Sequence, residues 1–240
     1  MIPKVIHYCW FGGNPLPNSV KQCIKSWQKF CPEYEIKRWD ESNFDVSSHP
    51  FMKKAYEEKV WAFVSDYARL KVVYDNGGIY LDTDVELVKN LDSLLCHNSY
   101  FGLQQAGCFI STGLGFGAVK NSCILNEIMK SYDLINFNSE KKSELACPRL
   151  NTKVFESFGY IYTNEIFQNE MFTIYPARYF DPYETKQGGR NLLCSETYSI
   201  HHYSASWCSN NQILKRKLVK FIGANVIIKL RSIIGSVIKW

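Results

Sequence analysis

The sequence predicts an α/β fold with a largely parallel sheet, and three observations support this prediction. Strand-like and helix-like segments alternate over roughly the first 85 residues. The chain has 240 residues, 46% of them hydrophobic, which is enough to bury one substantial core. No internal repeat or low-complexity linker divides the sequence. We therefore expect one domain over residues 1–210, followed by a basic tail over residues 211–240.

The first predicted elements are a strand over residues 3–10 (PKVIHYCW) and a helix over residues 18–31, separated by the loop FGGNPLP. Pro32 would end this helix. The apolar residues that recur at helical spacing are Val20, Cys23, Ile24, Trp27 and Cys31. Residues 34–39 alternate as a second strand would.

A second helical region, continuous or broken, is expected over residues 49–75, and Gly77 and Gly78 would stop it. The apolar run over residues 79–81 then predicts a buried strand. Further along, we expect strands within residues 101–119 and near residues 160–162 and 172–175. A helix is expected over residues 122–132 and a polar loop over residues 136–152.

Charge is distributed unevenly along the chain. The formal net charge is +5, but residues 211–240 contain seven Lys and Arg and no acid, which leaves about −2 on residues 1–210. This distribution, without any nucleic-acid-binding motif, argues against binding to nucleic acid. The nine cysteines lack zinc-type spacing, and the first residues lack the pattern of a secretory signal, so we expect free thiols in a reducing cytoplasm.

Two carboxylates follow the buried strand in the stretch GGIYLDTDVEL, residues 77–87. Side chains at i and i+2 of an extended chain point to the same side, so Asp82 and Asp84 could face one ion. Oxygen ligands favour Mg²⁺ or Mn²⁺, which often also bind the phosphates of a substrate. The alternative is a solvated strand end whose aspartates cap a turn.

The longer stretch AFVSDYARLKVVYDNGGIYLDTDVEL (residues 62–87) closely resembles the core of the DXD-containing glycosyltransferase family. That family includes bacterial capsule and O-antigen sugar transferases, Golgi mannosyl- and galactosyltransferases and, more distantly, the clostridial glucosylating toxins. Three further pieces resemble it in the same order. They are IPKVIHYCWFGG (2–13), SWQKFCPEYEIKRWDE (26–41) and HHYSASW (201–207).

The resemblance implies an A-type glycosyltransferase (Rossmann-like) fold, retention of anomeric configuration and a Mn²⁺ or Mg²⁺ ion that holds the donor diphosphate. It makes Asp84 the direct metal ligand and divides Asp82 between the metal and the ribose or sugar of the donor. Asp66 and Arg69, three residues apart on one helical face, would contact the donor sugar. These four residues are the catalytic candidates.

The resemblance also implies a set of donor-binding residues. The predicted set is Val5, His7, Tyr8, Trp10, Ser65, Tyr80, Ser206 and Trp207. Tyr8 or Trp10 could stack on uracil through its aromatic face. For the residues of the first strand, and for Trp207, packing in the core is the alternative.

His201 and His202 compete for the role of third metal ligand. Alternation along a strand would place them on opposite faces, so we expect one to face the ion. The family motif favours His201, and an imidazole among oxygen ligands suits Mn²⁺ better than Mg²⁺. The glycine-rich residues 107–122 could bring backbone close to the sugars, and they lack the spacing of a P-loop.

The tail ends in VIIKLRSIIGSVIKW (226–240), which places apolar residues on one helical stripe and Lys229, Arg231 and Lys239 largely off it. An amphipathic basic helix suits an anionic membrane surface, and the alternative is a helix docked on the catalytic domain. Its uncharged stretches are too short to span a bilayer.

Together these features predict a cytoplasmic enzyme, peripheral on the inner membrane face. It would transfer a hexose from a UDP-sugar to a lipid-linked oligosaccharide in capsule or O-antigen biosynthesis. The sequence offers no convincing protein nucleophile, so we expect front-face attack by the acceptor hydroxyl. A toxin-like protein glycosyltransferase and a non-catalytic nucleotide-sugar-binding module are the alternatives.

Overall fold

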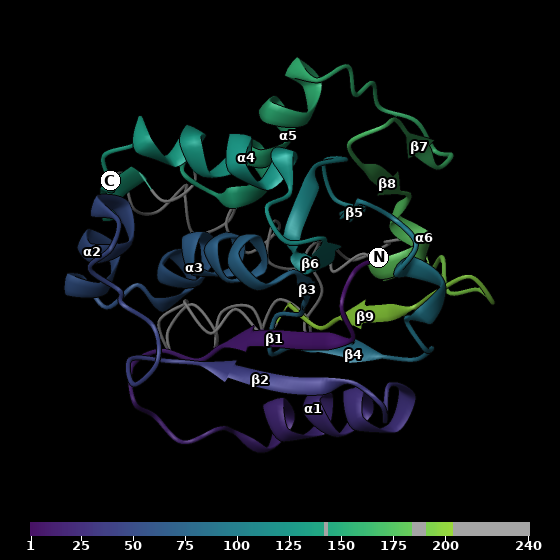
Figure 1. The fold of residues 1–240 in the computed structure, drawn as a ribbon, viewed down its shortest axis with the longest axis horizontal. Helices are drawn as coiled ribbons and strands as arrows, with labels where there is room; N and C mark the ends of the chain where they lie inside the picture. Colours follow the sequence, from purple (N-terminus) through teal and green to yellow (C-terminus); the bar gives the residue numbers. More distant parts are fainter. Residues whose placement is uncertain (142–143, 184–190, 204–240) are drawn as a thin grey trace, which may run out of the picture.

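The computed structural model describes residues 1–141, 144–183 and 191–203. They form a seven-stranded sheet in the order β2-β1-β3-β6-β5-β8-β7 and a separate two-stranded ribbon of β4 and β9 (Figure 1). The strands are β1 (Val5–Cys9), β2 (Glu35–Trp39), β3 (Gly78–Tyr80), β4 (Val85–Leu87), β5 (Ser99–Leu103), β6 (Ile110–Ala118), β7 (Phe167–Gln168), β8 (Thr173–Tyr175) and β9 (Ser199–His201).

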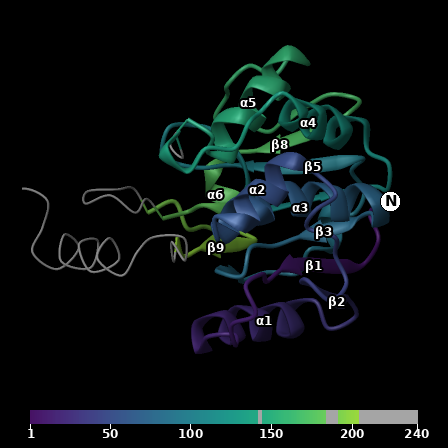
Figure 2. The ribbon, with the colours of Figure 1, turned by 90° about the vertical axis from the view of Figure 1, so that its left-hand side faces the viewer.

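The α-helices of the described residues lie on both faces of the sheet. They are α1 (Asn18–Phe30), α2 (Pro50–Glu57), α3 (Trp61–Asn76), α4 (Cys123–Asp133), α5 (Cys147–Ser157) and α6 (Ala177–Phe180), with short 3₁₀ turns at Asp92–Leu94 and Ser139–Lys141. Figures 1 and 2 show α1 at one end of the molecule and α4 and α5 at the other.

Two buried apolar clusters fill the space between the helices and the sheet. One cluster joins α2, α3, α4 and α5 to the sheet, and the other joins α1, β4 and α6 to its opposite face. Strand β1 contributes to both, because Ile6 and Tyr8 belong to the α1 cluster and Cys9 to the α3 cluster. The α/β prediction is therefore confirmed.

The sheet is mixed rather than largely parallel, which corrects the prediction. Strand β1 pairs in parallel with β2 and β3, and β5 pairs in parallel with β8. The pairs β3–β6, β5–β6 and β7–β8 are antiparallel. The parallel expectation fails after β3 because β5 and β6 follow each other as a hairpin, with no crossover helix between them.

The second helical region is broken at residues 58–60 into α2 and α3, and the helix predicted over residues 122–132 is α4. Two local predictions are wrong. Residues 160–162 form no strand, and the expected polar loop contains most of helix α5. The buried residues of α5 include Asn151 and Thr152, so its inward face carries a weak apolar signal.

Helix α1 fixes the position of strand β4 on the face of the sheet that both elements share. Trp27, which is fully buried, donates its indole N–H to the carbonyl of Val85 at 2.8 Å. The hydroxyl of Ser26 accepts from the backbone N–H of Leu87 at 2.9 Å. These two bonds join the middle of α1 to the strand that directly follows Asp84.

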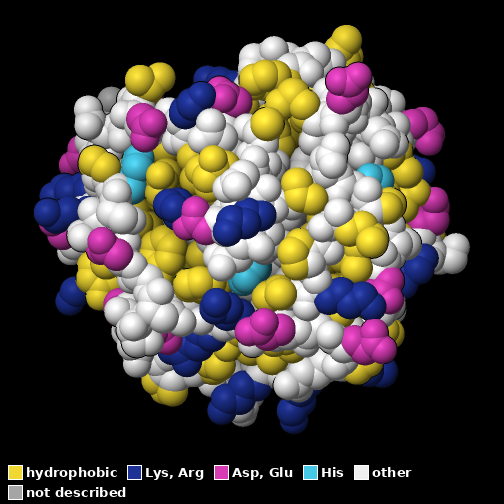
Figure 3. Space-filling view, in the orientation of Figure 1, with side chains coloured by type: hydrophobic (Ala, Val, Ile, Leu, Met, Phe, Trp, Pro, Cys, Tyr) yellow, Lys and Arg dark blue, Asp and Glu magenta, His cyan; other side chains and the backbone are white. Residues whose placement is uncertain are grey.

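Lysine, arginine, aspartate and glutamate side chains are interspersed with apolar ones on the face shown in Figure 3. No helix among the described residues is long and apolar enough to cross a membrane. Ser206, Trp207 and the predicted tail over residues 211–240 lie outside the described residues.

His7 lies in the core beside the glycine pair that ends α3. Its Nδ1 accepts from the indole of Trp39 at 3.1 Å, and its Nε2–H donates to the carbonyl of Gly77 at 2.8 Å. Gly77 and Gly78 have φ of 69° and 109°, and a Cβ at Gly78 would lie 2.8 Å from His7 Nε2. A side chain at this turn would therefore clash with a neutral, fully bonded imidazole.

This environment makes folding sensitive to acid. Burial lowers the pKa of His7 below 6.5, so the unfolded chain takes up a proton more readily than the folded one. Its contribution to stability is complete above pH 6.5 and is lost as pH falls, with a slope of at most about 1.4 kcal/mol per pH unit. Urea denaturation at pH 5.5 and 7.5 should show a smaller pH dependence in His7→Gln than in the wild type. Equal dependence would contradict the prediction.

Candidate active site

The DxD stretch begins where β3 ends, at the carboxyl edge that β3 shares with β1. The backbone N–H of Leu81 still bonds to the carbonyl of His7 at 3.0 Å, after which the chain leaves the sheet. A turn closed by the bond from Val85 N–H to the Asp82 carbonyl, at 3.0 Å, leads into β4. Asp82 and Asp84 are therefore held on a tight connection between two strands.

Strand β9 brings His201 to this turn. It pairs antiparallel with β4, with Val85 opposite His201 in the register. His201 Nε2 lies 3.1 Å from Asp84 Oδ1, and Asp82, Asp84 and His201 each offer a ligand atom within 4.8 Å of the others. His202 instead pairs with exposed Glu86 at 2.8 Å. The structure thus places His201, not His202, beside the two aspartates.

The electrostatics of His201 are dominated by its acidic neighbours. Burial acts to lower its pKa, but the nearby carboxylates of Asp84, Asp82 and Asp181 outweigh burial and raise the pKa above 6.5. Its Nδ1 is buried and has no hydrogen-bond partner among the described residues. Two carboxylates and an imidazole form a donor set that fits Mn²⁺.

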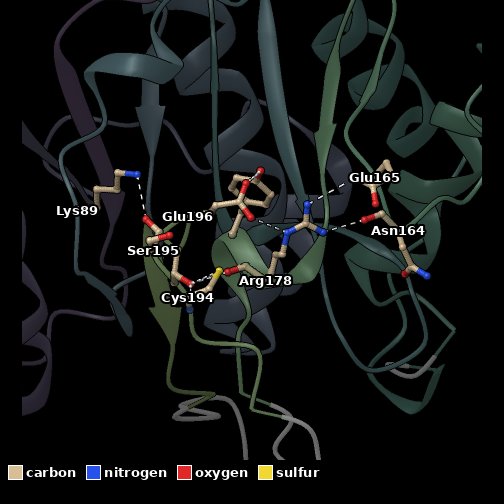
Figure 4. Close-up of polar contacts among 9 residues, drawn as sticks. Lys89, Asn164, Glu165, Arg178, Cys194, Ser195 and Glu196 are labelled. Atoms are coloured by element: carbon tan, nitrogen blue, oxygen red, sulfur yellow. Dashed lines mark hydrogen bonds and ion pairs between the residues drawn. The ribbon is translucent and has the colours of Figure 1, made fainter.

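A network around Arg178 anchors the segment that precedes β9 (Figure 4). Arg178 donates from Nε to Glu196 at 3.0 Å and from its terminal nitrogen to the carbonyl of Asn164 at 2.9 Å. On the other side, Lys89, which follows β4, donates to the carbonyl of Ser195 at 3.1 Å. These contacts hold the end of the β4–β9 ribbon where Leu87 lies opposite Ser199, and the pairing of β4 with β9 extends from there to His201.

The guanidinium of Arg69 lies behind the DxD turn, and its side chain is only 4% exposed. It contacts Asp66 at 2.9 Å and Asp82 at 3.4 Å, and its Nε donates to the carbonyl of Ser65 at 3.0 Å. It also lies over the ring of Tyr80, 5.2 Å from the centroid. Arg69 therefore links helix α3 to the first aspartate of the motif.

Tyr80 also holds the Asp82 carboxylate in place. Burial raises the pKa of the Tyr80 phenol far above its ordinary value, so the hydroxyl stays protonated and donates to Asp82 Oδ1 at 2.9 Å. Burial also raises the pKa of Asp82, opposed by Arg69, and raises that of Asp66 to about 6. Two acids share one buried cation at this position.

Sequence reasoning missed a polar chain that approaches Asp66 from α5. Asn151 Nδ2 donates to Thr112 Oγ1 at 3.1 Å, and Thr112 Oγ1 lies 3.8 Å from Cys147 Sγ. The thiol of Cys147 in turn acts to lower the pKa of Asp66, against the larger effect of burial. The available signal was Pro148 in the first turn of α5, followed by Asn151 and Phe155 at helical spacing.

The residues predicted on β1 are dispersed rather than gathered at this site. Val5 lies near the amino-terminal end of the strand, and His7 is bonded in the core. The ring of Tyr8 packs edge-on against Trp27, and the indole of Trp10 donates to the carbonyl of Asn14 at 2.6 Å. Their roles in donor binding stay predictions.

A groove of about 370 Å³ opens beside the cluster, between the first turns of α1 and strand β4. Its lining residues are Ser19, Val20, Gln22, Cys23, Thr83, Asp84, Glu86 and His202.

Comparison with known proteins gives concordant results. Residues 17–101 match the family model described as "Glycosyltransferase sugar-binding region containing DXD motif". The chain is 24% identical over 230 residues to an uncharacterized glycosyltransferase of Acanthamoeba polyphaga mimivirus, covering 90% of this chain and 87% of that protein. It is 29% identical over 141 residues to inositol phosphoceramide mannosyltransferase 3 of Schizosaccharomyces pombe, covering 57% of this chain and 39% of that protein.

Among solved structures, the fold is similar to that of the PaToxG glycosyltransferase, with a TM-score of 0.55 and 20% identity. The superposition covers 66% of this chain and 69% of that one. The family resemblance expected from the sequence is confirmed.

The buried charge of Arg69 leads to a stability prediction. Arg69→Met leaves Asp66 and Asp82 without their countercharge and should lower the free energy of unfolding by about 3–5 kcal/mol at pH 7.5. The loss should be smaller at pH 5, because the raised pKa of Asp66 lets it take up a proton. Urea denaturation measures both values.

The control is Lys71→Met on the same helix, which removes an exposed pair with Asp75 and should cost less than about 1 kcal/mol. A loss in Arg69→Met no larger than in this control, or a loss independent of pH, would show that Arg69 does not neutralise the two acids.

Proposed function

We propose that this chain, a glycosyltransferase with a DXD-type sugar-binding region, transfers a hexose from a UDP-sugar with retention of configuration and with the help of Mn²⁺ or Mg²⁺. The observation that supports this most strongly is the cluster of Asp82, Asp84 and His201 in front of a buried Arg69. It lies at the carboxyl edge of parallel strands, where α/β proteins commonly bind ligands.

Asp84 and His201 are the residues that would hold the metal, with the remaining oxygen of Asp82 as the third ligand. A bound divalent ion would offset the charge that develops on the departing diphosphate. Asp82 Oδ1 is already engaged by Tyr80 and Arg69, which leaves Oδ2 as its available oxygen. The oxygen not proposed for the metal is therefore held by protein groups, whereas the family resemblance divides Asp82 between the metal and the ribose or sugar of the donor.

The other side chains of the site position the donor. Asp66 and Arg69 present a hydrogen-bonding pair to the donor sugar, and Ser65, Tyr80, Ser206 and Trp207 complete the proposed donor site. With no assigned protein nucleophile, the acceptor hydroxyl attacks the anomeric carbon from the face that the diphosphate leaves. The C–O bond to phosphate breaks, the new glycosidic bond forms, and the leaving phosphate takes the proton. Such a step depends on positioning and charge stabilisation.

The proposed acceptor is a lipid-linked oligosaccharide of capsule or O-antigen biosynthesis, reached from the cytoplasmic face of the membrane. Two observations support a lipid-linked acceptor. The first is that one relative is named as a mannosyltransferase of inositol phosphoceramide. The second observation is the basic, acid-free composition of residues 211–240, which suits an anionic membrane surface.

The metal site can be tested directly. Asp84→Asn should raise the dissociation constant for Mn²⁺, and lower Mn²⁺-dependent hydrolysis of the UDP-sugar, by at least about 100-fold, because loss of even a partner of a ligand costs 10- to 100-fold. Isothermal titration calorimetry and a screen of UDP-sugars provide the two readouts.

The matched control is Asp75→Asn, an exposed acid near the end of α3 that pairs with Lys71. It should behave as the wild type. A wild-type protein that binds Mn²⁺ and UDP-sugar without turnover would identify a non-catalytic binding module. Unchanged metal binding in Asp84→Asn would remove Asp84 from the site.

Membrane association has its own test. Deletion of residues 211–240 should abolish co-sedimentation with vesicles that contain anionic phospholipid, since each basic residue near such a surface contributes about 1 kcal/mol. Vesicles of phosphatidylcholine alone are the control and should retain little of either protein. Unchanged sedimentation after the deletion would reject the proposed role of the tail.

A further inference from the structure

Alternate glycines of β6 lie against β3 and against the turn after β3 that contains the DxD motif. Strand β6 pairs antiparallel with β3, and Gly117 lies opposite Ile79 in the register. A Cβ at Gly115 would lie 2.7 Å from Leu81 Cδ2, and a Cβ at Gly113 would lie 2.8 Å from Asp82 Oδ2. The glycine-rich stretch therefore approaches the motif itself, in addition to any approach to sugars expected from the sequence.

Gly113 cannot be explained by backbone conformation, because its φ is not positive. What distinguishes it is the space beside its Cα. A Cβ there would be 2.8 Å from Asp82 Oδ2 and 3.3 Å from a terminal nitrogen of Arg69. Any side chain at position 113 would therefore collide with the Asp82 carboxylate, which is one of the three candidate metal ligands.

Neither neighbour can move without losing contacts. Asp82 Oδ1 is bonded to Tyr80 at 2.9 Å and lies 3.4 Å from Arg69. Arg69 is in turn fixed by Asp66 at 2.9 Å and by the carbonyl of Ser65 at 3.0 Å. A methyl group at position 113 would have to turn the carboxylate away from Arg69 or shift the buried guanidinium.

We propose that Gly113 is a positioning residue of the active site: the absence of a side chain there keeps the Asp82 carboxylate oriented toward both Arg69 and the divalent cation. The inference rests on the proposed function, because it assigns the oxygen beside Gly113 to the ion. It predicts that metal affinity depends on a residue that offers no ligand atom.

The experiment compares Gly113→Ala with Gly117→Ala. Both glycines lie on β6, and neither has a positive φ. A Cβ at Gly117 would lie 2.5 Å from the ring of Tyr100, which is not one of the candidate metal ligands. Both variants should lose thermal stability, each by roughly 3 °C or more in Tm. In calorimetric titrations with Mn²⁺, Gly113→Ala should raise the dissociation constant at least about 10-fold, and Gly117→Ala should leave it unchanged.

A double-mutant cycle tests the contact without using the metal. In an Asp82→Ala background the carboxylate is gone, so Gly113→Ala should cause a much smaller drop in Tm than in the wild type. Gly117→Ala should cause the same drop in both backgrounds. If Gly113→Ala alone gives no folded protein, recovery of folded protein in the double variant supports the inference, and failure of the double variant to fold contradicts it.

The outcomes separate this inference from the proposed function. A wild-type protein that neither binds Mn²⁺ nor hydrolyses UDP-sugars would overturn the function. A wild-type protein that does both, with equal Mn²⁺ affinity in Gly113→Ala, would overturn the inference alone. Equal drops in Tm for Gly113→Ala in the wild-type and Asp82→Ala backgrounds would also overturn the inference alone.

Discussion

The buried guanidinium of Arg69 is the interaction on which the rest of the site depends. One cation lies between Asp66 on its own helix and Asp82 at the end of β3, and it is almost fully removed from solvent. A charge in such a place is tolerated only when it is paired and hydrogen-bonded. The pairing fixes the position of α3 relative to the end of β3. The orientation of Asp82, the first aspartate of the motif, follows from that position.

The fold supplies the remaining groups from distant parts of the chain. Trp27 of α1 holds β4, β4 pairs with β9, and β9 delivers His201 to Asp84. Strand β6 presents Gly113 and Gly115 to the motif, so that Asp82 has room beside Arg69. Together these segments bring three ligand atoms within 4.8 Å of one another.

Much of this was accessible from the sequence, and the misses have physical causes. Extended periodicity after β3 predicts that Asp82 and Asp84 point to the same side. The family resemblance singled out Asp66 and Arg69, and helical spacing adds that these two share a face. The antiparallel pairing of β5 and β6 and the contact at Gly113 could not be found in this way, and helix α5 left only a weak apolar signal. They depend on tertiary neighbours: α5 buries polar Asn151, and the constraint at Gly113 exists only once β6 lies beside the motif.

The central claim is that Asp82, Asp84 and His201 bind one divalent cation that holds the diphosphate of a nucleotide sugar. Anomalous diffraction at the manganese edge, from crystals grown with Mn²⁺ and UDP, tests it most directly. The account predicts a single strong peak between Asp84 and His201, in contact with the diphosphate. Bound UDP with no peak there, or with a peak at other side chains, would contradict it.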